Sequence, residues 1–215
     1  MLLIFAATTL FGLTSAVHTG FDTTTKLAYA NMLCMRLNGY DFFIGRVWND
    51  AGKYDKDGVS NIKFAHESGY HRIDGYIFPC AKTNCAHASN QIEAAINRLR
   101  ADSANVTTLW IDVERASWSD NLEANQKFIQ EMAAKGDAMG QPMGVYSSRF
   151  NWKEVVGLNF TGLSKYPLWW ANYNKHQDMS GFQAFGGWKK PTLHQYKGSS
   201  VAPCHEVIIN ENWFP

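Results

Sequence analysis

Thr107-Thr108-Leu109-Trp110-Ile111-Asp112-Val113-Glu114 is a β-branched and apolar run that ends in two carboxylates. Such a composition is typical of a buried strand. Because the side chains of a strand alternate between its two faces, Asp112 and Glu114 point the same way, with Cα atoms roughly 6.5 Å apart. Two acids on one face repel each other, so one tends to keep its proton at neutral pH while the other is ionised. Glycoside hydrolysis uses such a pair, whereas a strand end where both acids reach solvent is the alternative interpretation.

Strand and helix patterns alternate on both sides of this stretch. Helices are predicted at 26–37, at 59–68, from about residue 89 and from about residue 119, with a short turn or helix at 149–156. The other predicted strands are 17–22, 41–48, 72–79, 142–147, 167–173, 191–196 and 206–210. The alternation favours a parallel sheet, and eight strands in 215 residues predict an irregular (β/α) TIM-like barrel in a single α/β domain. An open doubly wound sheet is the alternative, but no glycine-rich phosphate loop follows the first strand.

A barrel places its active-site side chains at the carboxyl ends of its strands. The acids expected there, as candidate catalytic residues, are Asp22, Asp112 and Glu114. The candidate substrate-binding residues at the same end are Arg46, Tyr76, Phe78, Tyr146, Trp170, Asn172 and Gln195. Each has an ordinary explanation when taken alone: Asp22 could cap a helix, and Arg46 could hold an acid in a salt bridge. Their convergence on one rim favours a functional site, and the aromatic rings would suit a sugar-binding cleft.

The first residues have the features of a secretory signal peptide, predicted at 1–16. An apolar run from Leu2 to Leu13 precedes Thr14-Ser15-Ala16, which places small residues before the cleavage point. A buried first helix is the alternative. The tripeptides that begin at Asn105 and Asn159 match the N-glycosylation pattern.

The rest of the composition limits the partners. No later stretch is long and apolar enough to span a bilayer. The formal net charge of +1 gives no argument for a nucleic acid or for an anionic membrane surface. We therefore expect a secreted protein, either extracellular or in a lysosomal or phagosomal lumen, that has no nucleic-acid partner and no membrane span.

Four cysteines follow the predicted cleavage point, and an even number in a secreted chain suggests two disulfides. The predicted barrel places Cys34 in the first helix, near the end of the barrel where the strands begin. It places Cys204 before the last strand, at the same end. It places Cys80 and Cys85 in one small loop above the third strand. We therefore expect the pairs Cys34–Cys204 and Cys80–Cys85. A metal site is the rival interpretation, but Cys34 and Cys80 would lie at opposite ends of the barrel.

Seven groups of residues recur in this order in a known family. They are Phe21-Asp22-Thr23-Thr24-Thr25-Lys26, Phe78-Pro79-Cys80 with Asn84-Cys85, Leu109-Trp110-Ile111-Asp112-Val113-Glu114, Gly144-Val145-Tyr146, Pro167-Leu168-Trp169-Trp170-Ala171, Phe185-Gly186-Gly187-Trp188 and His194-Gln195-Tyr196. Through them the chain resembles the glycoside hydrolase family 25 lysozymes of the Chalaropsis type, in particular the small secreted forms of protists and nematodes. The resemblance covers residues 17–215, which we interpret as one catalytic domain of this kind.

The resemblance implies hydrolysis of the β-1,4 bond between N-acetylmuramic acid and N-acetylglucosamine in bacterial peptidoglycan, for defence or digestion. It also implies that the reaction needs no metal or other cofactor, and we expect a monomer. By motif position, Glu114 would be the general acid, Asp112 its partner carboxylate and Asp22 the acid of the first strand. The positions that match the family's cleft lining are Tyr76, Tyr146, Trp170 and Gln195.

One departure from the family concerns the last strand, which usually ends in Val-Asp-Leu-Asn. This chain has Val207-Ile208-Ile209-Asn210, so Ile208 would stand in place of the acid. A catalytically impaired, lectin-like peptidoglycan-binding protein is therefore the alternative, although the three intact acids favour an enzyme. A barrel hydrolase that acts on chitin ranks lower, because its longer acidic motif would need acids where Thr108 and Trp110 stand.

Overall fold

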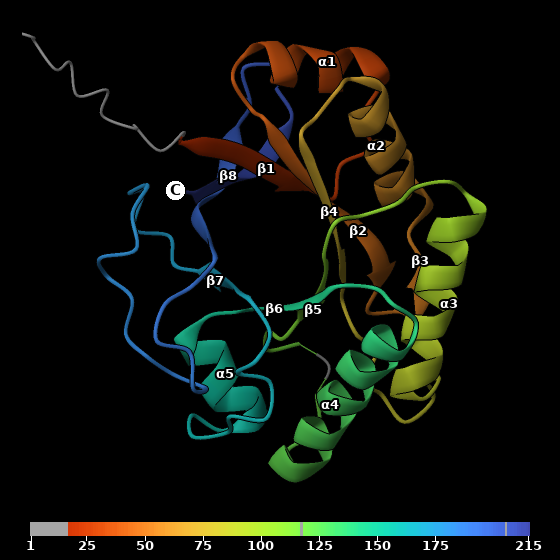
Figure 1. Ribbon diagram of the computed structural model, residues 1–215, viewed down its shortest axis with the longest axis vertical. Helices are drawn as coiled ribbons and strands as arrows, with labels where there is room; N and C mark the ends of the chain where they lie inside the picture. The colour runs from red at the N-terminus through yellow and green to blue at the C-terminus, as the bar shows by residue number, and fades with distance from the viewer. Residues whose placement is uncertain (1–16, 117, 205) are drawn as a thin grey trace, which may run out of the picture.

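The computed structural model describes residues 17–116, 118–204 and 206–215, and the predicted signal peptide at 1–16 lies outside these residues. In the described part of the chain, eight strands close into a ring, and the helices pack on its outside (Figure 1). The order of elements is β1 (His18–Thr23), α1 (Tyr29–Leu37), β2 (Phe42–Asn49), β3 (Lys53–Tyr54), α2 (Lys56–Glu67), β4 (Arg72–Ile77), α3 (Ala88–Ala101), β5 (Leu109–Asp112), α4 (Leu122–Ala138), β6 (Met143–Ser147), α5 (Arg149–Val156), β7 (Leu168–Ala171), β8 (Leu193–Val201) and β9 (Ile208–Phe214).

The ring runs β1-β2-β4-β5-β6-β7-β8-β9 and closes where β9 pairs with β1, while the short β3 pairs only with β2. Neighbouring strands from β1 to β8 are parallel. The strand β9 is antiparallel to both β8 and β1. The predicted barrel in one α/β domain is therefore confirmed, with a last strand that begins and ends later than predicted and runs in the opposite direction.

Large side chains pack the inside of the barrel. We call the end where the parallel strands finish the upper end. The buried interior cluster consists of Phe42, Ile44, Tyr76, Trp110, Tyr146, Trp169, Ala171 and Leu193. Space for the Trp110 ring depends on Gly144 of β6, because a Cβ there would lie 2.3 Å from the ring. The indole Nε1 of Trp110 donates to the fully buried carboxyl of Asp74 (3.0 Å), which Arg72 also contacts (2.8 Å).

The helices cover the barrel with apolar faces at helical spacing, as the sequence pattern predicts. In α3 this buried face includes Ile92, Ala95, Ile96 and Leu99. The helix α2 begins after Asp55, whose carboxylate accepts from the backbone N–H of Gly58 (2.9 Å). None of the helices in the described ranges combines the length and the apolar character needed to cross a membrane.

Both predicted disulfides are present, although the position expected for one cysteine was wrong. The Cα atoms of Cys34 and Cys204 are 6.0 Å apart, and those of Cys80 and Cys85 are 5.8 Å apart. Because β9 is antiparallel, Cys204 lies in the connection that follows the upper end of β8. That connection reaches outward to α1, where Cys34 lies (Figure 1).

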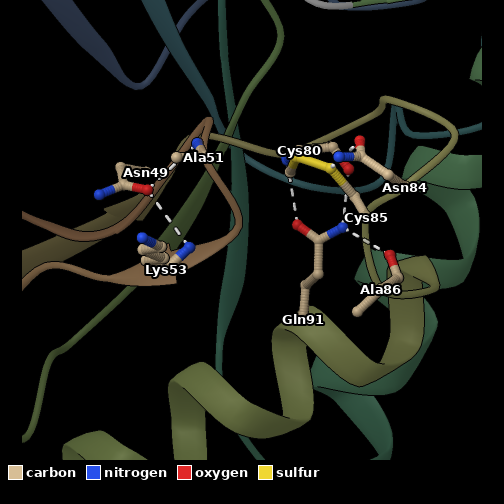
Figure 2. The surroundings of a disulfide bond; sticks show 8 residues. All are labelled: Asn49, Ala51, Lys53, Cys80, Asn84, Cys85, Ala86 and Gln91. Atoms are coloured by element: carbon tan, nitrogen blue, oxygen red, sulfur yellow. Dashed lines mark hydrogen bonds between the residues drawn. A yellow bond between two sulfur atoms is a disulfide. The ribbon is translucent and has the colours of Figure 1, made fainter.

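The Cys80–Cys85 loop is held from below by one side chain of α3 (Figure 2). The side-chain oxygen of Gln91 accepts from the backbone N–H of Cys80 (3.0 Å), and its Nε2 donates to the carbonyls of Cys80 and Ala86 (2.8 Å each). The loop is therefore fixed by three hydrogen bonds from a fully buried amide in addition to its disulfide.

Candidate active site

A pocket of about 230 Å³ opens at the upper end of the barrel. Its lining residues are Asp22, Thr24, Arg46, Tyr76, Phe78, Asp112, Glu114, Tyr146, Trp169, Tyr173, Gln195 and Asn210. They come from all eight strands of the ring or from the segments that directly follow them. All the site residues predicted from the sequence lie in this lining except Trp170 and Asn172.

The two exceptions, one on β7 and one directly after it, lie outside the pocket lining. Side-chain alternation turns Trp169 into the barrel, so Trp170 points to the outside. There its ring stacks on His194, with centroids 4.3 Å apart, and meets Phe182 edge-on. Asn172 comes after the end of the strand, where its carbonyl oxygen lies 2.8 Å from Nε2 of His194. Trp170 is therefore outside the pocket lining. A run of apolar residues does not show which of two adjacent tryptophans faces inward.

Other residues of the pocket were missed. Tyr173 lies in the loop after β7, where no periodic pattern indicates a direction. Asn210 of β9 lines the pocket, and Asn212 lies on the same face of the strand without lining the pocket. The alternation of these two residues is visible in the sequence. It could have been used only if the bounds and direction of that strand had been predicted correctly.

Asp22 lies at the end of β1, in a network of amide groups. Its Oδ1 accepts from Nε2 of Gln195 (2.7 Å) and from Nδ2 of Asn212 (2.8 Å), and its Oδ2 accepts from Nδ2 of Asn210 (2.9 Å). Burial raises the pKa of Asp22, and the three amide donors oppose that rise. Asp22 does not cap the following helix, since α1 begins after Ala28.

Asp112 and Glu114 face the same pocket from the end of β5. Asp112 is buried, and its Oδ1 has no hydrogen-bond partner among the residues that the structure describes. Burial raises the pKa of Asp112 well above its ordinary value, the charges of Glu114 and Asp22 raise it further, and Arg46 opposes them. Glu114 is only partly buried, and burial together with the charge of Asp22 raises its pKa as well. Because burial raises the pKa of both acids, the spacing of the pair predicts that Asp112 and Glu114 keep at least one proton between them.

Arg46 brings a positive charge to the lining. Its Nε donates to Asp55 (2.5 Å), the residue that caps α2. Arg46 is therefore a salt-bridge partner of Asp55, as one of the two interpretations of the sequence proposed. Its side chain also lines the pocket, as the other proposed. One guanidinium cannot neutralise three carboxylates, so the site favours retention of at least one proton.

The register of β9 corrects the position assigned to Ile208. The Ile208 side chain is 49 % exposed and does not line the pocket, whereas Asn210 pairs with Asp22 of β1. Compared with Val-Asp-Leu-Asn, the stretch Ile209-Asn210-Glu211-Asn212 keeps the final Asn and replaces the acid by an amide. Glu211 lies on the other face of the strand, where it bonds to Tyr196 (2.6 Å) and Lys197 (2.8 Å).

In residues 17–116, 118–204 and 206–215, no group of three or more His, Cys, Asp or Glu side chains is arranged to hold a metal ion. The site is thus a set of carboxyl groups, amides and aromatic rings at the upper end of a closed barrel. This is an arrangement typical of glycoside hydrolases, which use paired carboxyl groups.

Comparisons with known proteins agree with this class. A family model described as Lysozyme-like protein 1 (Lys-1) matches residues 14–196. The chain is 38 % identical to Lysozyme-like protein 5 of Caenorhabditis elegans, over 94 % of this chain and 93 % of that protein. It is 34 % identical to Probable GH family 25 lysozyme 4 of Dictyostelium discoideum, over 100 % of this chain and 98 % of that protein. The protein therefore belongs to the Lys-1 family of lysozyme-like proteins, among the glycoside hydrolase family 25 lysozymes.

Solved structures share the fold at low sequence identity. A family GH25 lysozyme from Aspergillus fumigatus superposes with a TM-score of 0.71 at 17 % identity, covering 93 % of this chain and 94 % of that one. A muramidase from Trichobolus zukalii gives a TM-score of 0.70 at 19 % identity, covering 92 % of this chain and 93 % of that one.

Proposed function

We propose that this protein is a lysozyme, an N-acetylmuramidase that hydrolyses the β-1,4 bonds between N-acetylmuramic acid and N-acetylglucosamine in bacterial peptidoglycan. The observation that carries the proposal is the convergence of Asp22, Asp112 and Glu114 in one pocket at the upper end of the barrel. Membership of the lysozyme family supports the same conclusion.

Glu114 is the general acid in this proposal. It is less buried than the other two acids, so its carboxyl is the one that reaches the glycosidic oxygen of a chain lying across the pocket mouth. The bond between the anomeric carbon and this oxygen breaks as the oxygen takes the proton of Glu114. Water then adds a hydroxyl to the anomeric carbon and returns its second proton to Glu114, which balances the reaction.

Asp112 and Asp22 surround the developing positive charge of the sugar. Both lie on the pocket wall, and together with Glu114 they exceed the charge of the single guanidinium of Arg46. Negative charge in a buried pocket stabilises an oxocarbenium-like transition state more strongly than it would in water. The rings of Tyr76 and Trp169 supply flat apolar walls for sugar rings.

The protein is secreted in this proposal, to the cell exterior or to a digestive or phagosomal lumen, and acts on bacteria there as food or as pathogens. The signal-like residues 1–16 and the two disulfides support this placement. It acts as a monomer, because one barrel contains the whole pocket. It has no nucleic-acid partner in this proposal, since the formal net charge of +1 gives no argument for one.

The test is the release of reducing ends from purified peptidoglycan by residues 17–215, with products identified as muramitol-terminated fragments after borohydride reduction. Glu114→Gln should lower turnover about 100-fold or more, because the amide has no proton to donate. Glu93→Gln is the matched control, since Glu93 lies on α3 and pairs with Lys135 far from the pocket. Near-normal turnover by Glu114→Gln would refute its role. Wall binding by the folded wild-type protein without release at any pH would favour the lectin-like alternative.

A further inference from the structure

The amides around Asp22 have fixed orientations. Oδ1 of Asn212 lies 2.8 Å from the indole Nε1 of Trp169. An indole N–H can only donate, so the oxygen of Asn212 must face Trp169 and its NH₂ must face Asp22. Asn212 is fully buried, so bulk solvent does not reach its amide group.

Asn210 is oriented in the same way by the backbone. Its Oδ1 accepts from the N–H of Ser199 on the neighbouring β8 (3.1 Å), so its NH₂ is directed at Oδ2 of Asp22 (2.9 Å). Gln195 completes the arrangement, because its oxygen lies within 2.9 Å of the hydroxyls of Tyr146 and Tyr173 while its NH₂ meets Asp22. Hydroxyls donate as well as accept, so Gln195 follows the orientation that the two asparagines impose.

Both oxygens of Asp22 therefore face groups that can only donate. Oδ1 already accepts two N–H groups, so a proton on it would place two donors against each other, and a proton on Oδ2 would weaken that oxygen as the acceptor for Asn210. We propose that Asn210 and Asn212 are positioning residues that keep Asp22 ionised as a hydrogen-bond acceptor, so that the exchangeable proton of the pocket is confined to Asp112 and Glu114.

Other groups facing Asp22 act on the same equilibrium. The titratable or charged side chains that line the pocket with it are Arg46 from β2, Tyr76 from β4, Asp112 and Glu114 from β5, Tyr146 from β6 and Tyr173 after β7. Asp55 neutralises Arg46, and Glu211 of β9 faces away from Asp22. Burial favours protonation of Asp22, and the three amide donors oppose it. The charge of Asp22 in turn raises the pKa of Asp112 and of Glu114.

The test replaces one amide donor by an acid of the same shape. In Asn210→Asp, a second carboxyl replaces the amide that lies 2.9 Å from Oδ2 of Asp22. Two carboxyls at this distance must share a proton. The pH at which Asp22 becomes ionised should rise by about one unit or more. The acid limb of the kcat/KM profile should move to higher pH by the same amount. Trp169→Phe should shift it in the same direction, since it removes the N–H that orients Asn212. The control is Glu211→Gln, on the opposite face of β9. The acid limb of the kcat/KM profile of this variant should stay at the wild-type pH.

The second readout does not depend on activity. In protein labelled with ¹³C at aspartate carboxyls, the Asp22 signal is identified by its loss in Asp22→Asn, and its chemical shift is followed with pH. The proposal predicts that Asp22 of the wild type is ionised at a lower pH than Asp112. It is overturned if Asp22 holds its proton to higher pH than Asp112, or if folded Asn210→Asp and Trp169→Phe leave the Asp22 titration unchanged. This inference rests on the proposed function only where the test uses the pH profile of kcat/KM. Wild-type protein that titrates as predicted but releases no reducing ends would refute the hydrolase and leave the positioning role standing.

Discussion

Removing the Cys34–Cys204 disulfide should destabilise the protein far more than removing Cys80–Cys85. The first pair joins residues separated by 170 positions and the second joins residues separated by 5. If a disulfide acts by restricting the unfolded chain, the long loop contributes about 5 kcal/mol to the free energy of unfolding and the short loop about 2 kcal/mol. The variants are Cys34→Ser with Cys204→Ser, and Cys80→Ser with Cys85→Ser.

The folded state adds to this difference. Cys204 is 1 % exposed, and Nδ2 of Asn38 lies 3.6 Å from the sulfur of Cys34 and 3.7 Å from that of Cys204. A loss of about 5 kcal/mol in a chain of this size lowers Tm by roughly 10–20 °C. The short-loop variant serves as the matched control, because it carries the same pair of serine substitutions.

The assay is urea unfolding of residues 17–215 under non-reducing conditions, followed by tryptophan fluorescence and far-UV circular dichroism. Below its Tm the long-loop variant should still hydrolyse peptidoglycan, because neither of its sulfurs lines the pocket. A loss of stability in the short-loop variant equal to or greater than that in the long-loop variant would refute the reasoning from loop length.

Three other predictions concern the barrel interior, the buried acid and the surface. Gly144→Ala places a Cβ 2.3 Å from a buried indole and should cost about 1–3 kcal/mol. Gly181→Ala, with its nearest neighbour at 3.8 Å, should stay within about 0.5 kcal/mol, and equal losses in urea unfolding would contradict the packing argument. Because burial raises the pKa of Asp112, the folded chain keeps a proton that the unfolded chain releases. Wild-type stability should therefore fall as pH rises from the ordinary carboxyl range to the raised value, and parallel pH curves for wild type and Asp112→Asn would refute this. Asn105 and Asn159 are exposed and precede the lower ends of β5 and β7, away from the pocket. Secretion from eukaryotic cells should attach N-glycans to both without changing hydrolysis, and secreted protein whose mass shows neither glycan would contradict this.

Sequence alone was sufficient for most of the barrel. Alternation with period two in strands and helical spacing in the covering helices are local patterns, so β1 to β8 of the ring were expected close to their observed positions. The rule that barrel sites lie at the carboxyl ends of strands then brought Asp22, Asp112 and Glu114 together, although Asp22 is distant from the others in the chain. The disulfide pairs were also predicted correctly, although Cys204 was expected at the wrong end of the barrel.

Only the tertiary structure decided the direction of β9 and, through that direction, the surroundings of Asp22. Antiparallel closure against β1 places Asn210 and Asn212 over Asp22 and leaves Ile208 at the surface. The choice between the two tryptophans of β7 was settled in the same way, by the register of that strand in the ring. The resting place of the proton also depends on burial and on neighbours from distant strands. These properties arise from contacts between segments far apart in the chain, whereas a sequence pattern reports only what neighbouring residues have in common.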